Sequence, residues 1–259
     1  MVFSTLMLTT KTINMKSIRI YALGIIALLT TGVLVSSCEK SFDEKTVQDR
    51  DFSNSSLIRV FVATVNASRN YISVDGKPIN GAGLASGGIF PSAGVYASNI
   101  PAGFKAFLVR DTLTATTQIP LSFSENMQVN KNYTIFLYDT INSPKQKTVE
   151  TKYEIPTDNT CRIRFANFIY NPTIVPAIDI FSFSRNANVF TNVAVTDVTN
   201  FISYATDILT DTLYIRETGT NVNIAKLSIG NFFTQKRSYT LVYRGSHRGT
   251  RAATLYTDR

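Results

Sequence analysis

The sequence predicts an all-β protein built from two tandem antiparallel β-sandwich domains. Tryptophan is absent, whereas 17 phenylalanines and 12 tyrosines are interspersed with β-branched and small polar residues, a composition typical of sheets. The second half of the chain repeats the first, as set out below. No stretch after residue 37 carries a sustained 3.6-residue apolar stripe, so we expect little helix.

The repeat is visible at one constant offset. Aligned segments are 107–112 (FLVRDT) with 213–218 (LYIRET), 121–123 with 227–229, and 133–137 with 239–243. With shifts of one or two residues, 58–60 matches 163–165 and 96–99 matches 204–207. Self-similarity of this kind indicates two copies of one structural unit.

Each copy has roughly 100 residues, enough for a sandwich with its own core. We expect domains at 57–155 and 159–259, of immunoglobulin or transthyretin-like type, that fold separately. Phe107 and Val109 fall on one face of a strand, and Leu108 and Arg110 fall on the other, which predicts a half-buried strand. The strand-like runs of the first copy are 57–64, 71–74, 95–100, 105–111, 118–123, 133–138 and 147–153.

The N-terminal region reads as a secretory signal over residues 1–37, with Met15 as the expected true start. Lys16 and Arg19 precede an apolar run that is interrupted at residues 30–32. The alternative interpretation is a transmembrane anchor, but this run is shorter than the roughly 20 apolar residues that a membrane-spanning helix needs. Residues 34–38 (LVSSC) resemble the lipobox of bacterial lipoproteins, and the resemblance implies that Cys38 receives lipid and anchors the chain in the membrane.

Residues 38–56 are polar and charged, and we expect a flexible tether there. Removal of residues 1–37 lowers the formal charge from +8 to +5, because three basic residues and no acidic ones are lost. The remaining basic residues are scattered along the sequence, so it lacks the clustered basic patch that is typical of nucleic-acid binding. Because Cys38 is assigned to lipid, Cys161 has no cysteine left to pair with inside the chain. We expect Cys161 to be a small buried hydrophobic residue at the start of a strand.

Both copies open with an apolar-Arg-apolar segment, Ile58-Arg59-Val60 and Ile163-Arg164-Phe165. In the second copy Asn171-Pro172 then leads to residues 177–181 (AIDIF), whereas the first copy lacks the proline and keeps residues 74–76 (VDG). These features resemble the bacterial domain of unknown function numbered 4397, which occurs as tandem copies in Bacteroidetes cell-surface lipoproteins. The resemblance implies a surface location and carries no known activity.

Catalytic chemistry has few candidates in this chain. The single histidine, His247, lies in a Gly- and Arg-rich segment that predicts a solvated hairpin tip. One histidine and one unpaired cysteine exclude a zinc site of the usual ligand count, and we expect no metal and no cofactor. The hairpin is instead a candidate for binding acidic glycans or headgroups, through Arg244, His247, Arg248 and Arg251, together with Arg259 at the end of the chain.

Other candidate sites are weaker. Four tyrosines near loops could stack on sugars in place of tryptophan, namely Tyr71, Tyr96, Tyr170 and Tyr204, although packing at sandwich edges is the alternative. The Asp-Thr-apolar triplets containing Thr112, Thr140 and Thr212 resemble the sites at which Bacteroidetes O-glycosylate exported proteins, a match that a Thr-rich chain also produces by accident.

We therefore expect a non-enzymatic, lipid-anchored protein of the outer membrane, on its periplasmic face or at the cell surface. Its role would be binding or structural, with membrane lipid as one partner through Cys38 and a glycan or protein as another. The alternative is a fimbrial subunit or adhesin, in which cleavage at Arg50 or Arg59 exposes a strand-accepting groove. A secreted hydrolase is disfavoured because acid, base and nucleophile candidates do not cluster in the sequence.

Overall fold

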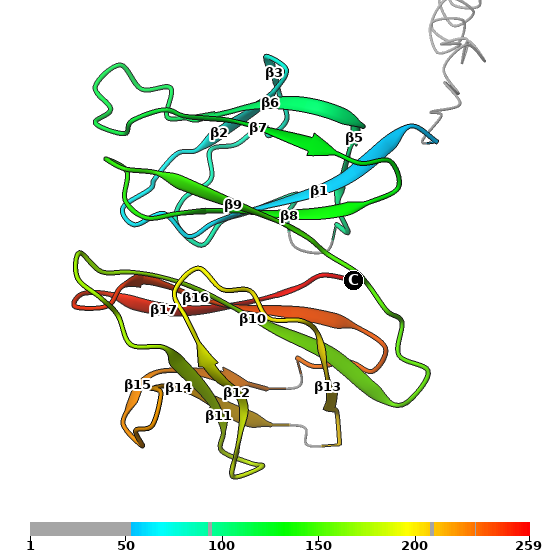
Figure 1. Ribbon diagram of the computed structural model, residues 1–259, viewed down its shortest axis with the longest axis vertical. Coiled ribbons are helices and arrows are strands. Elements are labelled where there is room, and N and C mark those ends of the chain that lie inside the picture. The colour runs from blue at the N-terminus through cyan, green and yellow to red at the C-terminus, as the bar shows by residue number, and fades with distance from the viewer. Residues whose placement is uncertain (1–52, 93–94, 208–209, 231) are drawn as a thin grey trace, which may run out of the picture. The chain divides into compact units, whose positions relative to one another are not determined.

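The structure is a computed structural model that describes residues 53–92, 95–207, 210–230 and 232–259 (Figure 1). These residues belong to one compact unit spanning 51–259. Within the described ranges every regular element is a strand, and a membrane-spanning helix is not found there. The all-β expectation is confirmed. The predicted signal, Cys38 and most of the predicted tether lie outside the described residues.

The first sandwich is formed by two facing sheets. One has the order β4-β1-β8-β9, with β5 also paired to β1, and the other has the order β3-β2-β6-β7. All seven predicted strands are present, and the two-residue strands β3 and β4 are additional. The bounds are β1 (Ser55–Val62), β2 (Tyr71–Val74), β3 (Lys77–Pro78), β4 (Ile89–Phe90), β5 (Ser98–Pro101), β6 (Gly103–Arg110), β7 (Leu121–Met127), β8 (Asn132–Tyr138) and β9 (Lys145–Glu150).

The second sandwich repeats this plan. Its sheets have the orders β13-β10-β16-β17 and β12-β11-β14-β15. Figure 1 shows these eight strands in the green-to-red part of the chain. The bounds are β10 (Thr160–Tyr170), β11 (Ile178–Ser182), β12 (Ala187–Val193), β13 (Ile202–Ala205), β14 (Asp211–Glu217), β15 (Asn223–Ile229), β16 (Ser238–Ser246) and β17 (Arg251–Thr257).

Two strand pairs differ from the antiparallel expectation. β1 runs parallel to β8, and β10 runs parallel to β16. In each sandwich the chain between the two strands crosses to the opposite sheet and returns, so it re-enters the first sheet in the same direction. The sheets are therefore mixed, with one parallel pair per sandwich.

Strand register confirms the repeat, with one correction. Ile58 is paired with Tyr133 and Ile163 with Tyr239, at matching positions in the two copies. The alignment of Tyr96 with Tyr204 is wrong. Tyr204 lies within β13 opposite Cys161, the position that Ile100 of β5 occupies in the first copy, whereas Tyr96 precedes β5. The loops before these two strands differ between the copies. A short sequence match therefore does not identify which residues hold equivalent positions in the two strands.

A short turn shows how the local sequence directs the fold. Strands β2 and β3 are joined through Asp75 and Gly76, which have φ angles of 50° and 77°. A two-residue hairpin with positive φ at both positions favours Asp-Gly, because this turn matches the right-handed twist of the flanking strands.

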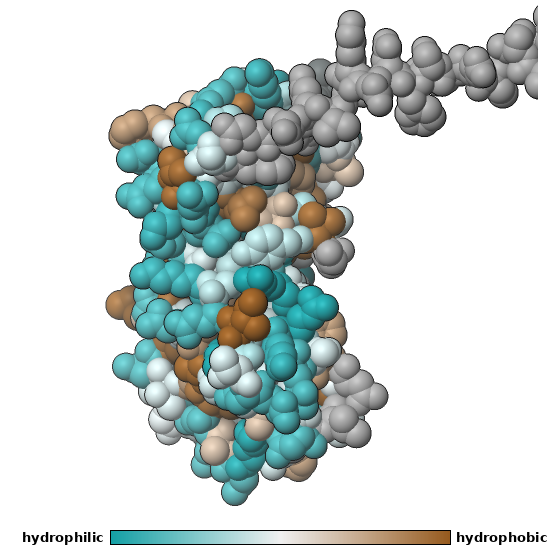
Figure 2. Space-filling view, turned by 90° about the vertical axis from the view of Figure 1, so that its right-hand side faces the viewer, coloured by the Kyte–Doolittle hydropathy of each residue, from teal (hydrophilic) through white to brown (hydrophobic). Residues whose placement is uncertain are grey.

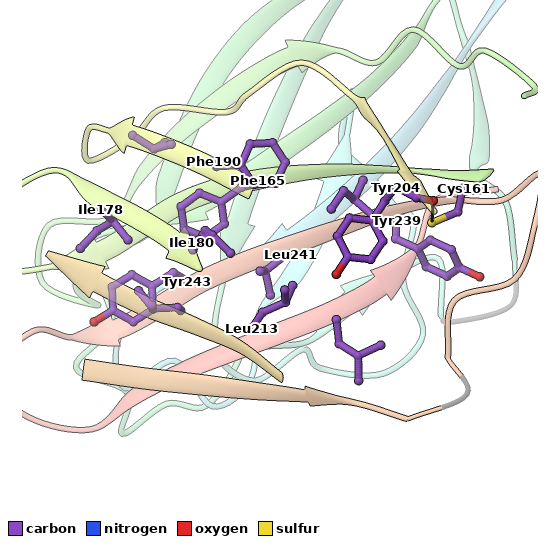
Figure 3. Close-up of a cluster of buried hydrophobic side chains, with 14 of the residues drawn as sticks. Cys161, Phe165, Ile178, Ile180, Phe190, Tyr204, Leu213, Tyr239, Leu241 and Tyr243 are labelled. Carbon is purple, nitrogen blue, oxygen red and sulfur yellow. Dashed lines mark hydrogen bonds between the residues drawn. The ribbon is translucent and has the colours of Figure 1, made fainter. Parts of the chain in front are cut away.

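Each sandwich has its own hydrophobic core between its two sheets. In the first, Phe107 and Val109 are 2 % and 3 % exposed, as the alternation predicts. In the second, Cys161 is fully buried, and Figure 3 shows it beside Tyr204 and Tyr239. The expectation of a buried cysteine near the start of a strand is confirmed.

A third hydrophobic cluster joins the two sandwiches. Phe136 of β8 stacks on Phe168 of β10 with ring centroids 4.6 Å apart, and Phe61 of β1 stacks on Tyr256 of β17 at 5.5 Å. We call this contact between sheets β4-β1-β8-β9 and β13-β10-β16-β17 the seam. Its buried members are Phe61, Ala63, Phe136, Ala166, Phe168, Val242 and Tyr256.

Candidate ligand cleft between the two sandwiches

A buried polar network lies beside the seam cluster. Arg164 of β10 donates through Nη1 and Nη2 to the hydroxyls of Thr151 and Thr134 in the first sandwich, at 3.2 and 3.1 Å. Its Nη2 also lies 3.4 Å from the carboxylate of Asp258, and both side chains are buried. Burial raises the pKa of Asp258, while the Arg164 charge and the Thr240 hydroxyl oppose the shift.

Arg59 of β1 reaches across the seam in the other direction. Its Nη1 donates to the carbonyl oxygen of Thr257 at 2.5 Å, and its Nη2 donates to Val95 O at 2.9 Å and to Tyr96 O. Arg59 is only 3 % exposed, and its Nε is buried without a hydrogen-bond partner. A buried donor left unpaired is costly, and such donors are rare in native proteins.

Arg59 forms part of the wall of an open cleft of about 730 Å³ between the sandwiches. This volume is within the range of small-molecule sites. We call it the arginine cleft. The residues that matter for its chemistry are Arg59 and Tyr96 from the first sandwich and Phe232, Arg237, Tyr239 and Arg259 from the second.

The arginine cleft is positively charged. Arg237 and Arg259 are exposed, and neither forms an ion pair with any residue that the structure describes. Among the side chains that line the cleft, the carboxylate is that of Asp258, which is engaged by Arg164 and Thr240. Guanidinium groups without a carboxylate partner favour an anionic ligand, because their planar fork matches carboxylate, sulfate or phosphate oxygens.

Aromatic rings accompany the arginines. The guanidinium of Arg259 lies 5.8 Å from the centre of the Tyr96 ring. Tyr96 in turn packs on Tyr153, with ring centroids 5.3 Å apart. Phe232 is 45 % exposed, although its ring packs on that of Tyr239 with centroids 5.4 Å apart. On the face seen in Figure 2, hydrophobic side chains form small separate groups in a mostly hydrophilic surface. The cleft thus combines cations with a few ring surfaces, which suits an anion attached to an organic body.

The other copy of the repeat carries an equivalent cleft of different charge. Strand register places Arg164 at the position of Arg59, and this second cleft, of about 480 Å³, includes Arg164 in its wall. Glu150 also lines it and forms an ion pair with Lys131 at 2.8 Å. The two clefts can therefore be compared position by position.

That comparison shows why Arg237 has no ion-pair partner among the described residues, whereas its counterpart in the first copy has one. Lys131 corresponds to Arg237, because the residues that follow them hold matching positions opposite β1 and β10. Glu150 corresponds to Thr257, since they pair with the equivalent Tyr133 and Tyr239. The acid that neutralises Lys131 in the first copy is thus a threonine in the second.

The C-terminal hairpin differs from the sequence expectation. Arg244 is not free, because its Nη1 donates to Ser86 Oγ of the first sandwich at 3.1 Å. Arg251 donates to the carbonyl oxygen of His247 at 2.6 Å and to that of Ile224 at 3.2 Å. Arg248 is exposed as expected. Of the three hairpin arginines, these contacts leave only Arg248 available to a ligand.

The expectation of a solvated His247 is wrong. Its side chain is 13 % exposed, its Nε2 lies 3.3 Å from Glu217 Oε1, and its backbone N–H donates to Tyr170 O at 2.8 Å. Chain folding brings β14 against the hairpin, which sequence spacing could not reveal. Among the described residues no serine or cysteine side chain is hydrogen-bonded to this pair, and no group of three His, Cys, Asp or Glu side chains is placed to hold a metal.

Of the four candidate tyrosines, Tyr96 lines the arginine cleft and Tyr204 is buried in the core, which rules out stacking of Tyr204 on a sugar. The other two have different surroundings. Tyr71 is half-buried beneath the guanidinium of Arg69, 5.8 Å from its ring centre. Tyr170 lines a separate pocket. Neither belongs to the arginine cleft. Sequence reasoning named Tyr96 as a possible sugar-stacking ring but missed Arg59 and Arg237 as site residues. The signal that could have found the cleft is the change from Glu150 to Thr257 between the aligned copies.

Comparisons with known proteins give little further information. No family model matches the sequence, and no curated protein is similar to it. Among solved structures, a family 26 carbohydrate-binding module from Eubacterium rectale Amy13K in complex with maltoheptaose is 13 % identical, covering 78 % of this chain and 96 % of that chain, with a TM-score of 0.24. A structure of alpha-glucan binding by a streptococcal virulence factor is 11 % identical, covering 78 % and 97 %, with a TM-score of 0.25. Scores this low carry no argument about this chain.

Proposed function

We propose that this chain is a lipid-anchored binding protein of the bacterial outer membrane, without catalytic chemistry, and that it holds an anionic ligand in the arginine cleft. The observation that carries the proposal is the cleft itself, where Arg237 and Arg259 have no ion-pair partner among the described residues. The ligand would contact both sandwiches. The anchor at Cys38 rests on the lipobox resemblance.

A catalytic role finds no support in the residues described. Ser182, Tyr204 and Asp211 are hydrogen-bonded together, but all three are buried and no substrate could reach them. His247 is paired with Glu217 and has no serine or cysteine partner in the described ranges. A general base needs a proton within hydrogen-bond reach, so we propose binding in place of hydrolysis.

The fimbrial alternative is disfavoured by the first strand. β1 pairs with β8 on one side and with β4 and β5 on the other, so it is an interior strand. Cleavage after Arg59 would require access to a side chain that is 3 % exposed. Loss of β1 would remove one of the two arginines that cross the seam. Arg50, the other suggested cleavage position, lies outside the described residues.

The proposal is tested by titrating the full chain with acidic oligosaccharides, such as galacturonate and heparin fragments, which separate carboxylate from sulfate recognition. Replacement of Arg237→Ser with Arg259→Ser should weaken binding at least tenfold, and binding to the unchanged protein should fall as salt rises. The matched control removes two exposed charges elsewhere, by Arg110→Ser with Arg248→Ser, and should change affinity less than threefold.

Two results would contradict the proposal. Equal binding by the cleft variant and the unchanged protein would remove the arginine cleft as the site. Loss of binding in the control, and not in the cleft variant, would return the ligand to the C-terminal hairpin, where the sequence first suggested it. In either assignment His247→Ala should leave affinity nearly unchanged, because the interaction depends on the charge of the arginines.

A further inference from the structure

A third pocket lies elsewhere on the seam, with chemistry unlike that of the arginine cleft. It has a volume of about 380 Å³, within the range of small-molecule sites. The first sandwich contributes Tyr138, Asp139 and Lys145, and the second contributes Tyr170, Asn171 and Ile174, among others. None of these residues lines the arginine cleft.

The charges in this pocket cancel. Lys145 Nζ lies 2.8 Å from Asp139 Oδ2, and this bond raises the pKa of Lys145, so the lysine stays protonated and the pair stays neutral overall. The arginine cleft, in contrast, has guanidinium groups with no ion-pair partner in the described residues. A pocket with a self-neutralised ion pair favours an uncharged ligand, because an ionic one would have to be desolvated without a counter-charge.

Several hydrogen-bonding groups of the pocket are available. The side-chain amide of Asn171 donates to Thr173 Oγ1 at 2.7 Å, but its Oδ1 is buried without a partner. The hydroxyls of Tyr138 and Tyr170 make no hydrogen bond to any residue in the described ranges. These groups can both donate to and accept from a ligand, which suits hydroxyl groups.

Apolar surface completes the pocket. Ile174 is 96 % exposed, although a side chain of this kind is usually buried. The Tyr170 backbone is held in β10 opposite Ser246, and its carbonyl oxygen accepts the His247 N–H at 2.8 Å, so the residue that carries this ring is fixed before any ligand arrives. Tyr138 packs one side of its ring against Phe168, with centroids 5.3 Å apart.

We propose that this pocket binds an uncharged saccharide unit. A sugar ring has an apolar face that packs on aromatic and aliphatic side chains and an edge of hydroxyls that need partners. Tyr170 and Ile174 would supply the surface, and Asn171, the tyrosine hydroxyls and the Asp139–Lys145 pair would supply the partners. This site does not depend on the arginine cleft, so the protein would bind two classes of ligand at separate places on the seam.

The experiment is calorimetric titration of the full chain with neutral hexasaccharides of glucose, xylose, mannose and N-acetylglucosamine. At least one should bind with a Kd below the millimolar range. Tyr170→Ala should raise this Kd at least tenfold, equivalent to about 1.4 kcal/mol. Tyr170→Phe keeps the ring and should raise it less than threefold, and Asn171→Ala should weaken binding while leaving the ring in place.

Two control variants test whether the sugar binds in this pocket and not at another place on the protein. Tyr71→Ala removes a half-buried tyrosine outside the pocket and should leave the Kd unchanged. Arg237→Ser with Arg259→Ser should also leave neutral binding unchanged while it weakens acidic binding at least tenfold. Thermal melting of each variant identifies any that fail to fold.

Three outcomes would overturn the inference. Failure of all the neutral hexasaccharides to bind would remove the site, whether or not acidic ligands bind. Undiminished binding in folded Tyr170→Ala with Asn171→Ala would place the sugar elsewhere. Loss of neutral binding in the arginine variant would assign the sugar to the arginine cleft.

Discussion

Arg59 and Arg164 hold equivalent positions in the two repeats, and each extends its side chain across the seam into the other sandwich. Arg59 is opposite Thr134 on the parallel strand β8, and Arg164 is opposite the equivalent Thr240 on β16. Arg59 donates to the carbonyl oxygen of Thr257 in the second sandwich, and Arg164 donates to Thr134 in the first. The apolar-Arg-apolar segment of each copy therefore joins the copies together with the seam cluster.

Loss of Arg164, the arginine of the second copy that crosses the seam, should lower the stability of both sandwiches together. Arg164→Ala leaves the buried Asp258 carboxylate without its cation, and removal of one partner of a buried ion pair costs about 3–5 kcal/mol. Arg164→Met with Asp258→Leu removes both charges and should cost less than the single substitution. Urea denaturation measures both effects, and a loss below about 1 kcal/mol for Arg164→Ala would show that the network contributes little.

The seam also changes what is expected of separated halves. The sequence predicts two domains that fold separately, but division at residue 157 would expose Phe61 and Phe136 on one fragment and Phe168 on the other, all of which are buried in the intact chain. We expect the intact chain to unfold in one transition and the fragments to self-associate or melt at lower temperature. Two well-separated transitions in calorimetry of the full chain would contradict this.

Asp211 should make stability depend on acid pH. Burial alone would raise its pKa, but hydrogen bonds from Ser182, Tyr204 and Ser184 outweigh burial, so the pKa is below its ordinary value. A carboxyl of this kind stabilises the fold above its unfolded pKa of about 3.9 and loses this contribution as pH falls through the lower folded value. Asp211→Asn should lower stability at pH 7 and flatten its pH dependence below about pH 4. An unchanged acid profile would contradict the assignment.

Cys161 should be chemically inert in the folded protein. Burial raises the pKa of its thiol to about 12, and only the thiolate is nucleophilic. Iodoacetamide at neutral pH should leave peptides containing Cys161 unmodified, whereas the same reagent in guanidinium should modify them fully. Mass spectrometry distinguishes the two states, and rapid alkylation of the folded chain would show that the core around β10 opens.

Cys38→Ala tests the proposed anchor. Because Cys38 alone supplies the thiol for lipid, the variant should leave the membrane fraction or retain an uncleaved signal. Fractionation and intact-mass measurement report both results. Detection of an unmodified chain that begins at Met15 in wild-type cells would contradict the lipoprotein assignment.

Local sequence determined much of this fold because its signals act over a few residues. Alternation at Phe107 and Val109 identified a half-buried strand, and Asp75-Gly76 has the residue types that a tight turn requires. The repeat located equivalent strands in both copies. These inferences need only the two-residue period of a strand and the geometry of a turn.

Only the tertiary structure decided where the functional groups meet. The sequence separates Arg59 from Arg259 by 200 residues and His247 from Glu217 by 30, and no local periodicity relates them. The first proximity follows from the packing of sheets β4-β1-β8-β9 and β13-β10-β16-β17 at the seam. The second follows from the packing of β14, in the facing sheet of the second sandwich, against the β16–β17 hairpin. The sequence therefore determined the strands and the repeat, whereas the long-range packing of those strands decided which arginines are buried, which are paired and which remain free in a cleft.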